Sequence, residues 1–209
     1  MKILIATKNK GKFGEIKGGL GTDFEIGFLG DYQVDDSDFV EDGMTHEENA
    51  RKKARYYFEK VGDGFDFVIG EDSGIYVDAL KDELGVQTRR WGAGDAASDE
   101  EWLEYFMKEM KVRAPAFDQR GAKFVCCACV VGRVGAAGSG TLTRLFKGET
   151  LGLITDSVMA PILPGLPLSS VFLPEGFDKV YAALSREEKN KISHRGQAVG
   201  KVREWLLDL

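Results

Sequence analysis

Short apolar runs and helical periodicities alternate along this chain, which predicts strands and helices in close succession. Apolar runs bounded by glycine or charged residues indicate strands, whereas apolar residues three or four apart behind a capping residue indicate helices. The predicted strands are residues 2–6, 24–29, 65–70, 123–134 and 141–146, with a further short apolar element at 75–80. The predicted helices are 12–20, 45–60, 98–110, one that begins at Ser185, and 197–207.

This order of elements predicts the fold class. Strands and helices interleave, and residues 135–140 form a glycine-rich turn that joins two strands as a hairpin. A hairpin makes its strands antiparallel, so we expect an α/β fold with a mixed sheet rather than a purely parallel one. The length of 209 residues suits a single domain that spans residues 1–209.

Helix starts carry capping signals. Thr45 is followed three residues later by Glu48, and Ser185 by Glu188, so each hydroxyl can accept a hydrogen bond from the N3 amide while the glutamate reaches back. Ser98 begins a third helix in the same way. Glu48 is therefore expected to be a capping residue and Glu47 a solvated one. His46 belongs to this cap and is expected to be exposed and without a role.

Composition narrows the possible functions. Lys and Arg number 28 against 34 Asp and Glu, a net charge of −6, which argues against a protein that binds nucleic acid along a groove. We find no apolar run of about 18 residues, so no membrane span is expected, and the run at 2–6 is too short for a signal peptide. An acidic protein that binds a small anion needs local cations or a metal ion to do so.

The three cysteines, Cys126, Cys127 and Cys129, lie in the apolar run 124–131. The C-x-x-C spacing could indicate zinc or redox chemistry. Without a second cysteine pair or a nearby histidine, a buried strand explains them better. Three neighbouring cysteines with no distant partner favour a reducing compartment, and we expect a cytoplasmic protein.

A lysine-rich turn follows the first predicted strand and leads into a helix. A glycine, clustered lysines and a helix N-terminus suit phosphate binding. The turn is not a Walker A loop, because G-x-x-x-x-G-K-[ST] is absent. The alternative is a solvated basic loop. The candidate residues are Thr7, Lys8, Asn9, Lys10, Gly11 and Lys12.

Acidic residues form a second cluster, with Glu41 before the second helix and Glu71–Asp72 after the strand predicted at 65–70. Magnesium prefers one or two carboxylates together with phosphate oxygens and waters. Carboxylates at the end of a strand could face a ligand at the edge of the sheet. A purely structural role for Asp72 is the alternative.

The third cluster is the polar segment 189–196, which contains Lys189, His194 and Arg195. A hydroxyl, an imidazole and a guanidinium in the adjacent positions 193–195 suit an anion or the edge of a base. The alternative is a helix C-terminus, where cations meet the negative end of the helix dipole.

Taken together, these clusters resemble the Ham1 family of inosine and xanthosine triphosphate pyrophosphatases, and the resemblance runs nearly end to end. The family's T-G-N-x-x-K is similar to residues 7–12, and its E-T-G-x-T-F-x-E-N-A-x-x-K-A to residues 41–54. Its D-D-S-G-L-x-V-D-A-L is similar to residues 71–80. Its P-E-G and E-K-N-x-x-S-H-R are similar to residues 174–176 and 188–195.

The resemblance implies water attack on the α-phosphorus of a nucleoside triphosphate, which releases the monophosphate and pyrophosphate. It implies that Asp72 is the general base and that Glu41 and Asp72 hold Mg²⁺. It also implies an elongated mixed sheet with flanking helices, two lobes around a central cleft, and a homodimer. The substrate-binding residues that it implies are Lys12, Lys53 and the 7–12 loop for the triphosphate, Lys189, His194 and Arg195 for the base and its neighbours, and also Ser73 and Arg90.

One segment departs from the family pattern. Where the family has G-F-G-Y-D-P-x-F, residues 165–172 carry Leu166 and Leu168 in place of aromatic residues and Ser169 in place of aspartate. Three hypotheses remain: hydrolysis of non-standard purine triphosphates (ITP, XTP, dITP), the same chemistry with another or broader base choice, and a nucleotide-binding protein that has lost catalysis. The retention of Asp72, Glu41 and Lys53 argues against the third.

Overall fold

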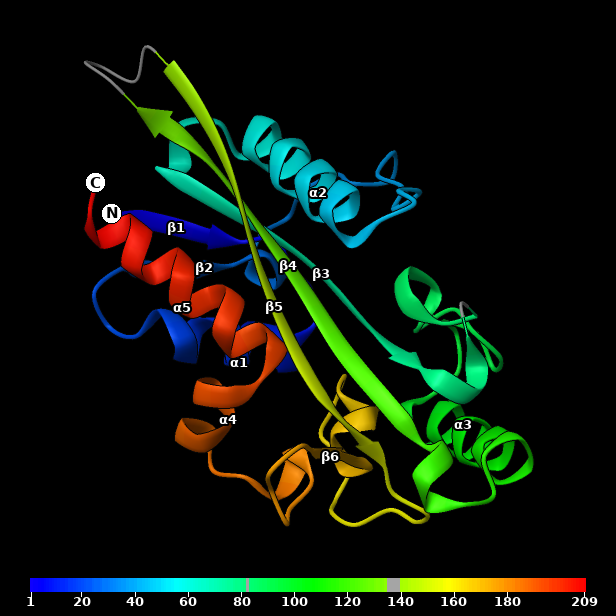
Figure 1. Ribbon diagram of the computed structural model, residues 1–209. Helices are drawn as coiled ribbons and strands as arrows, with labels where there is room; N and C mark the ends of the chain where they lie inside the picture. Colours follow the sequence, from blue (N-terminus) through cyan, green and yellow to red (C-terminus); the bar gives the residue numbers. More distant parts are fainter. Residues whose placement is uncertain (82, 135–139) are drawn as a thin grey trace.

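The computed structural model describes residues 1–81, 83–134 and 140–209. In this part of the chain a six-stranded mixed sheet has the order β2-β1-β3-β4-β5-β6 (Figure 1). The strand β1 pairs in parallel with β2 and β3, and the pairs from β3 to β6 are antiparallel. The strands are β1 (Lys2–Ile5), β2 (Glu25–Phe28), β3 (Phe67–Val77), β4 (Gly121–Val134), β5 (Gly140–Ile154) and β6 (Phe172–Pro174).

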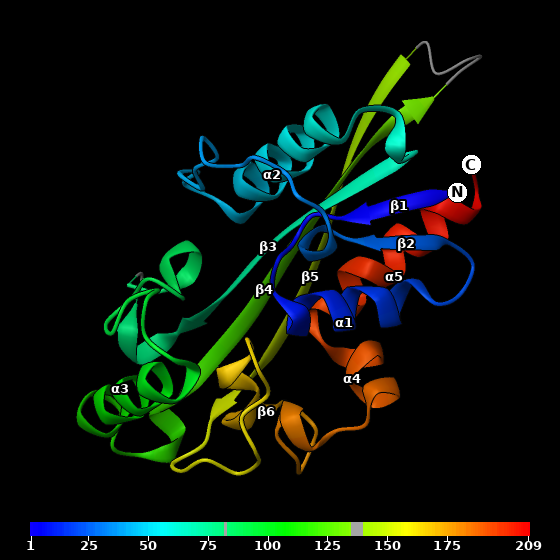
Figure 2. The same cartoon turned by 180° about the vertical axis from the view of Figure 1, so that it is seen from behind.

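Helices cover both faces of one half of the sheet, as Figures 1 and 2 show from opposite sides. One face carries α1 (Lys10–Leu20), α4 (Arg186–Ile192) and α5 (His194–Leu207), and the other carries α2 (His46–Val61). The helix α3 (Asp99–Arg113) lies at the far end of the long strands, near β6.

Successive side chains of a strand point to opposite faces of the sheet, so its core residues fall into two clusters, one on each face. Ile69 and Cys126 belong to the apolar cluster under α1 and α5, whereas Val68, Cys127 and Cys129 belong to the cluster under α2. All three cysteines are buried and unpaired, which confirms the expectation of a core strand.

A third cluster builds a second lobe at the other end of the same strands. Ile75 from β3 and Phe124 from β4 pack there with Trp102 and Phe106 of α3. The expected fold is therefore confirmed: a mixed sheet with flanking helices whose long strands pass through two lobes.

Some predicted boundaries were wrong. The strand predicted at 141–146 is β5, which continues to Ile154. The strand β3 does not end at Gly70 but continues to Val77, so Glu71 and Asp72 lie inside it rather than after it. The antiparallel partner β4 pairs with every residue from Phe67 to Val77, which holds the strand together across its glycines.

The two glycines of β3 do not form turns. At each of them the backbone of another segment lies so close to the strand that a side chain would not fit. A Cβ on Gly70 would lie 2.4 Å from the Ala50 carbonyl of α2, and one on Gly74 would lie 2.1 Å from the Gly85 carbonyl. The supposed separate element at 75–80 is the end of β3 followed by a short 3₁₀ turn.

The capping signals were predicted correctly. Thr45, Ser98 and Ser185 each cap a helix with both hydrogen bonds of the capping box. The last helix begins at His194 rather than Gln197, because Ser193 caps it. The predicted turn 135–140 falls almost entirely outside the described residues. Within the described part, no helix is both long and apolar enough to cross a membrane.

Candidate active site

A cavity of about 580 Å³ lies where the short strand β1 ends and β3 continues. Ile5, the last residue of β1, pairs with Ile69, and no strand of the described residues pairs with this edge of β3 beyond that point. Farther along, the Ile75 amide on this edge donates to the Thr88 hydroxyl (3.0 Å). The gap between these two points opens onto the cavity, whose volume falls within the usual range for small-molecule sites.

Most of the predicted site residues come together here. Two do not: Lys10 is exposed on α1, and Gly11 packs against the 164–166 segment, so neither lines the cavity. The predicted residues that line it are Thr7, Lys8, Asn9, Lys12, Glu41, Lys53, Asp72, Ser73, Arg90, Leu166, Ser169, Lys189, His194 and Arg195.

The lysine-rich turn is held in place by Asn9, which caps α1. Its side-chain oxygen accepts from the Lys12 amide (2.9 Å), and its amide group donates to the Gly165 carbonyl (3.1 Å). The Thr7 hydroxyl accepts from the Asn9 amide (3.1 Å), and Lys8 pairs with Asp36 (2.7 Å). The turn is thus fixed locally and joined to the other lobe.

Glu71 lies on the α1/α5 face of β3 and is only 2% exposed. The Lys12 ammonium lies 3.0 Å from one carboxylate oxygen, and the Arg195 guanidinium donates to the other from Nε (3.1 Å) and Nη2 (3.0 Å). Burial raises the pKa of Glu71, but Arg195 and Lys12 outweigh burial and hold it well below its ordinary value. Glu71 is therefore a buried counter-ion and does not line the cavity.

Glu15 is a cavity residue that the sequence reasoning missed. Its carboxylate pairs with Lys189 (2.5 Å) and with Arg195. Burial raises its pKa, but these cations lower it overall. Glu15 follows Lys12 by three residues on α1, so the two share one face of the helix, and this spacing was the available signal.

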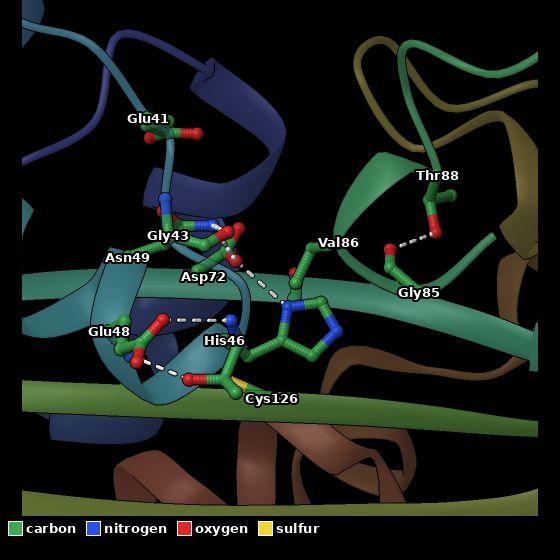
Figure 3. Close-up of polar contacts among 12 residues, drawn as sticks. Glu41, Gly43, His46, Glu48, Asn49, Asp72, Gly85, Val86, Thr88 and Cys126 are labelled. Carbon is green, nitrogen blue, oxygen red and sulfur yellow. Dashed lines mark hydrogen bonds and ion pairs between the residues drawn. The ribbon is translucent and has the colours of Figure 1, made fainter. Parts of the chain in front are cut away.

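Asp72 points to the opposite face of β3, toward the start of α2 (Figure 3). Its Oδ2 accepts from Asn49 Nδ2 (3.2 Å) and lies 2.8 Å from His46 Nδ1. Burial raises the pKa of Asp72, but the hydrogen bond with His46 and the charge of Lys12 bring it below the ordinary value. The carboxylate is therefore ionised at neutral pH.

The expectation for His46 was wrong. Its side chain is 3% exposed and contacts Asp72, instead of extending into solvent. The Thr45–Glu48 capping box makes His46 the first residue of α2, and Asn49 follows three residues later on the same side. The box was visible in the sequence, but only the packing of α2 against β3 turns these two side chains inward.

Lys53 and Arg90 hold the acidic segment from two sides. Lys53 pairs with the Glu41 carboxylate and donates to the main-chain carbonyl of Glu71 (3.0 Å). Arg90 donates from the other lobe to the Glu41 carbonyl (3.0 Å). Both cations and the Glu41 carboxylate line the cavity.

Another part of the cavity wall contains stacked aromatic rings, one of which is a neutral histidine. His194 stacks on Phe124 with ring centroids 4.5 Å apart and planes at 8°. Burial, reinforced by the charge of Arg195, holds the pKa of His194 well below its ordinary value, so the ring is neutral. Lys189 donates to the Ser169 hydroxyl (3.2 Å) beside Leu166.

The donors for a metal ion are few. In the described parts of the chain, no three His, Cys, Asp or Glu residues are grouped so as to hold a metal ion by themselves. Glu41 and Asp72 both present carboxylates to the cavity. Two carboxylates suit a hard ion such as Mg²⁺, which takes its remaining ligands from waters and a bound phosphate chain.

The fold and the site define an α/β protein whose interlobe cavity joins cations, carboxylates and stacked aromatic rings. The sequence pattern of the Ham1 family matches residues 3–205, and the chain belongs to that family. It is 34% identical over 206 residues to a dITP/XTP pyrophosphatase of Oceanobacillus iheyensis, covering 98% of both chains.

Solved structures agree with this assignment. A Ham1 protein from Staphylococcus aureus superposes with a TM-score of 0.74 at 30% identity, covering 100% of this chain and 99% of that one. A HAM1 protein from Coxiella burnetii superposes with a TM-score of 0.77 at 26% identity, with 100% of both chains covered.

The Glu71 cluster yields a prediction about stability. Glu71→Gln removes the buried counter-charge of Lys12 and one of the two carboxylates that pair with Arg195, so the free energy of unfolding at pH 7 should fall by about 3–5 kcal/mol. The pKa of Glu71 is lower in the folded chain than in the unfolded one. Its charge therefore stabilises the fold above the ordinary glutamate pKa of 4.5, and this contribution is lost as the pH falls below that value.

Urea unfolding of both proteins as a function of pH tests this prediction. The stability gap should be widest near neutral pH and narrow below about pH 4.5. Glu187→Gln, which removes an exposed pair with Lys191, is the control and should leave stability almost unchanged. A gap that stayed constant down to acid pH would show that the Glu71 charge is not what the fold requires.

Proposed function

We propose that this protein is a nucleoside triphosphate pyrophosphatase that hydrolyses non-standard purine triphosphates, such as dITP, XTP and ITP, to the monophosphate and pyrophosphate. The observation that carries the proposal is the ionised Asp72, which faces the same cavity as Lys12 and Lys53. The dITP/XTP pyrophosphatase from Oceanobacillus iheyensis, similar over the whole chain, supports the same activity.

The phosphate chain would lie against the α1 N-terminus and the lysines. Lys12 and Lys53 are fixed by Glu71 and Glu41 before any ligand arrives, so little side-chain entropy is lost when they bind a phosphate. The turn at 7–12 adds main-chain amides at the positive end of the helix dipole. These lysines and amides make the cavity suitable for a polyanion, although the chain as a whole is acidic.

Glu41 and Asp72 would hold the Mg²⁺. The ion would neutralise charge on the phosphate chain and polarise a phosphoryl oxygen. Asp72 suits this position because its Oδ2 is occupied by His46 and Asn49, while no described residue donates to its Oδ1. The carboxylate thus keeps one oxygen for the site.

Oδ1 has a second lone pair beside the one that would contact Mg²⁺, and this lone pair can orient a water molecule and accept its proton. The water oxygen then forms a bond to the α-phosphorus, the bridge from the α- to the β-phosphate breaks, and pyrophosphate leaves with the bonding electrons. A carboxylate whose pKa is lowered is ionised and ready at neutral pH.

The base would occupy the end lined by Leu166, Lys189 and His194. Lys189 carries only donors, so it suits a carbonyl oxygen such as that of hypoxanthine or xanthine rather than the amino group of adenine. The neutral His194 ring, held on Phe124, can contribute one donor and one acceptor.

A broader base choice is the second candidate, favoured by residues 165–172. Leucine at 166 can cover a base face but lacks the ring quadrupole of an aromatic side chain. Ser169 shares Lys189 with Glu15, and its hydroxyl can rotate to donate or accept. Weaker discrimination against standard nucleotides would follow.

The remaining expectations rest on composition and the family resemblance. We propose a cytoplasmic homodimer that acts on free nucleotides and does not bind nucleic acid, in keeping with the net charge of −6.

Asp72→Asn tests the proposed chemistry. The amide cannot accept the proton of water or serve as an anionic metal ligand, so kcat should fall by about 10²–10⁴-fold while the fold is retained. Pyrophosphate release from dITP and XTP with Mg²⁺ is the measurement, and circular dichroism checks the fold. A variant with more than about a tenth of the wild-type kcat would show that Asp72 is not the base.

Lys53→Ala should weaken all triphosphates by a similar factor, because Lys53 would contact phosphate and not the base. Loss of a charge-assisted contact should lower kcat/KM by a factor that corresponds to a free energy of about 1.5–3 kcal/mol. The matched control is Lys52→Ala, which removes the neighbouring, exposed lysine that pairs with Asp42 and should leave kcat/KM unchanged. A loss that depended on the base would place Lys53 elsewhere in the site.

Leu166→Phe combined with Ser169→Asp reverses two of the three departures from the family pattern and should sharpen the preference for ITP. Aromatic stacking of a base contributes about 1–3 kcal/mol, by analogy with nucleic-acid readers. The measurement is kcat/KM for ITP, XTP, GTP and ATP in both proteins. If the natural protein already prefers ITP over GTP by about a thousandfold, residues 165–172 do not set the base choice.

A further inference from the structure

His46 stands where the Ham1 block E-T-G-x-T-F-x-E-N-A has phenylalanine, and it is buried against Asp72. Phenylalanine carries no hydrogen-bond donor, whereas an imidazole nitrogen can donate to a carboxylate. At this position the chain therefore has a polar contact that the family block does not provide.

We propose that His46 is a positioning residue of the active site, which fixes the orientation of the Asp72 carboxylate by donating a hydrogen bond from Nδ1 to Oδ2. The inference rests on the proposed function, because it concerns the group that would bind water and metal. It adds a role for a side chain that differs from the family pattern.

The distance between His46 Nδ1 and Asp72 Oδ2 is 2.8 Å, that of a hydrogen bond. A carboxylate oxygen accepts hydrogen bonds, so the proposed role places the proton on Nδ1. The buried His46 Nε2 has no hydrogen-bond partner among the described residues. The ring also meets Tyr76 edge-to-face, with centroids 6.0 Å apart and planes at 89°. His46 is thus restrained by packing on one side and by Asp72 on the other.

The contact is directed at one oxygen. His46 and Asn49, from the first turn of α2, both bond Oδ2, so rotation of the carboxylate would break two hydrogen bonds at once (Figure 3). Oδ1 then keeps a constant place at the cavity. The capping box at Thr45 and Glu48 fixes the start of α2 and hence the position from which both donors act.

The test compares His46→Phe, which installs the residue of the family block, with His46→Asn, whose amide can replace Nδ1 as the donor. Loss of a comparable partner of a metal-ligating group costs about 10–100-fold, so we expect His46→Phe to lower kcat by such a factor. KM for the triphosphate should stay within about threefold, because the phosphate and base contacts are untouched. His46→Asn should recover most of the kcat.

Tyr76→Leu is the control for packing. It removes the ring that packs on His46 without touching Asp72, so kcat should stay close to that of the wild type. If Tyr76→Leu lowered kcat as much as His46→Phe, packing and not the hydrogen bond would be responsible. Equal losses in His46→Phe and His46→Asn would overturn the proposal as well.

A second measurement does not depend on turnover. The chain has two histidines, so ¹⁵N NMR of the imidazole rings, assigned with His46→Asn, reports which nitrogen carries the proton. We expect a protonated Nδ1 on His46 that exchanges slowly with water. An Nδ1 that carries no proton would overturn the proposal even if His46→Phe failed to fold.

Turnover of the wild type and of His46→Phe separates the role of His46 from the proposed activity. Absence of pyrophosphate release by the wild type would overturn the proposed function, and the role of His46 with it. Wild-type turnover combined with an unchanged kcat in His46→Phe would overturn the role of His46 alone.

Discussion

The buried ion pair between Glu71 and Arg195 is the interaction on which the site depends. It joins the middle of β3 to the first turn of α5 across 124 positions of sequence. Burying either charge without its partner would cost free energy, so the ion pair forms only when β3 and α5 are both in place. Through Glu15, the same arginine also positions α1 and the Lys189 side chain of α4. One charged network thus defines the wall of the cavity from four separate elements.

Two adjacent carboxylates acquire different roles because a strand alternates its side chains. Glu71 faces α5 and is neutralised by cations, whereas Asp72 faces α2 and is held by neutral or weakly basic donors. Both oxygens of Glu71 are therefore paired with cations, whereas Asp72 keeps one oxygen that faces the cavity. A shift of one residue in the pairing of β3 with β4 would exchange the two faces and destroy both arrangements.

Much of the fold could be predicted from the sequence, because its signals are local. The capping boxes at Thr45 and Ser185 and the apolar run around Cys127 report their own structure. The continuity of β3 could not be predicted, because Gly70 resembles a turn signal until α2 is known to pack against it. His46 was misjudged for the same reason: a polar residue at a helix start is ordinarily solvated, and only the tertiary contact with Asp72 buries it.

The strands β3, β4 and β5 run through both lobes, and this has a mechanical consequence. A flexible linker would let two lobes swing about a hinge, but here three hydrogen-bonded strands act as a continuous beam. Its bending stiffness opposes any large change in the angle between the lobes. Access to the cavity must then depend on contacts that bridge the opening, such as Asn9 with Gly165 and Arg90 with Glu41. A product that left by this route would need to break only these few hydrogen bonds.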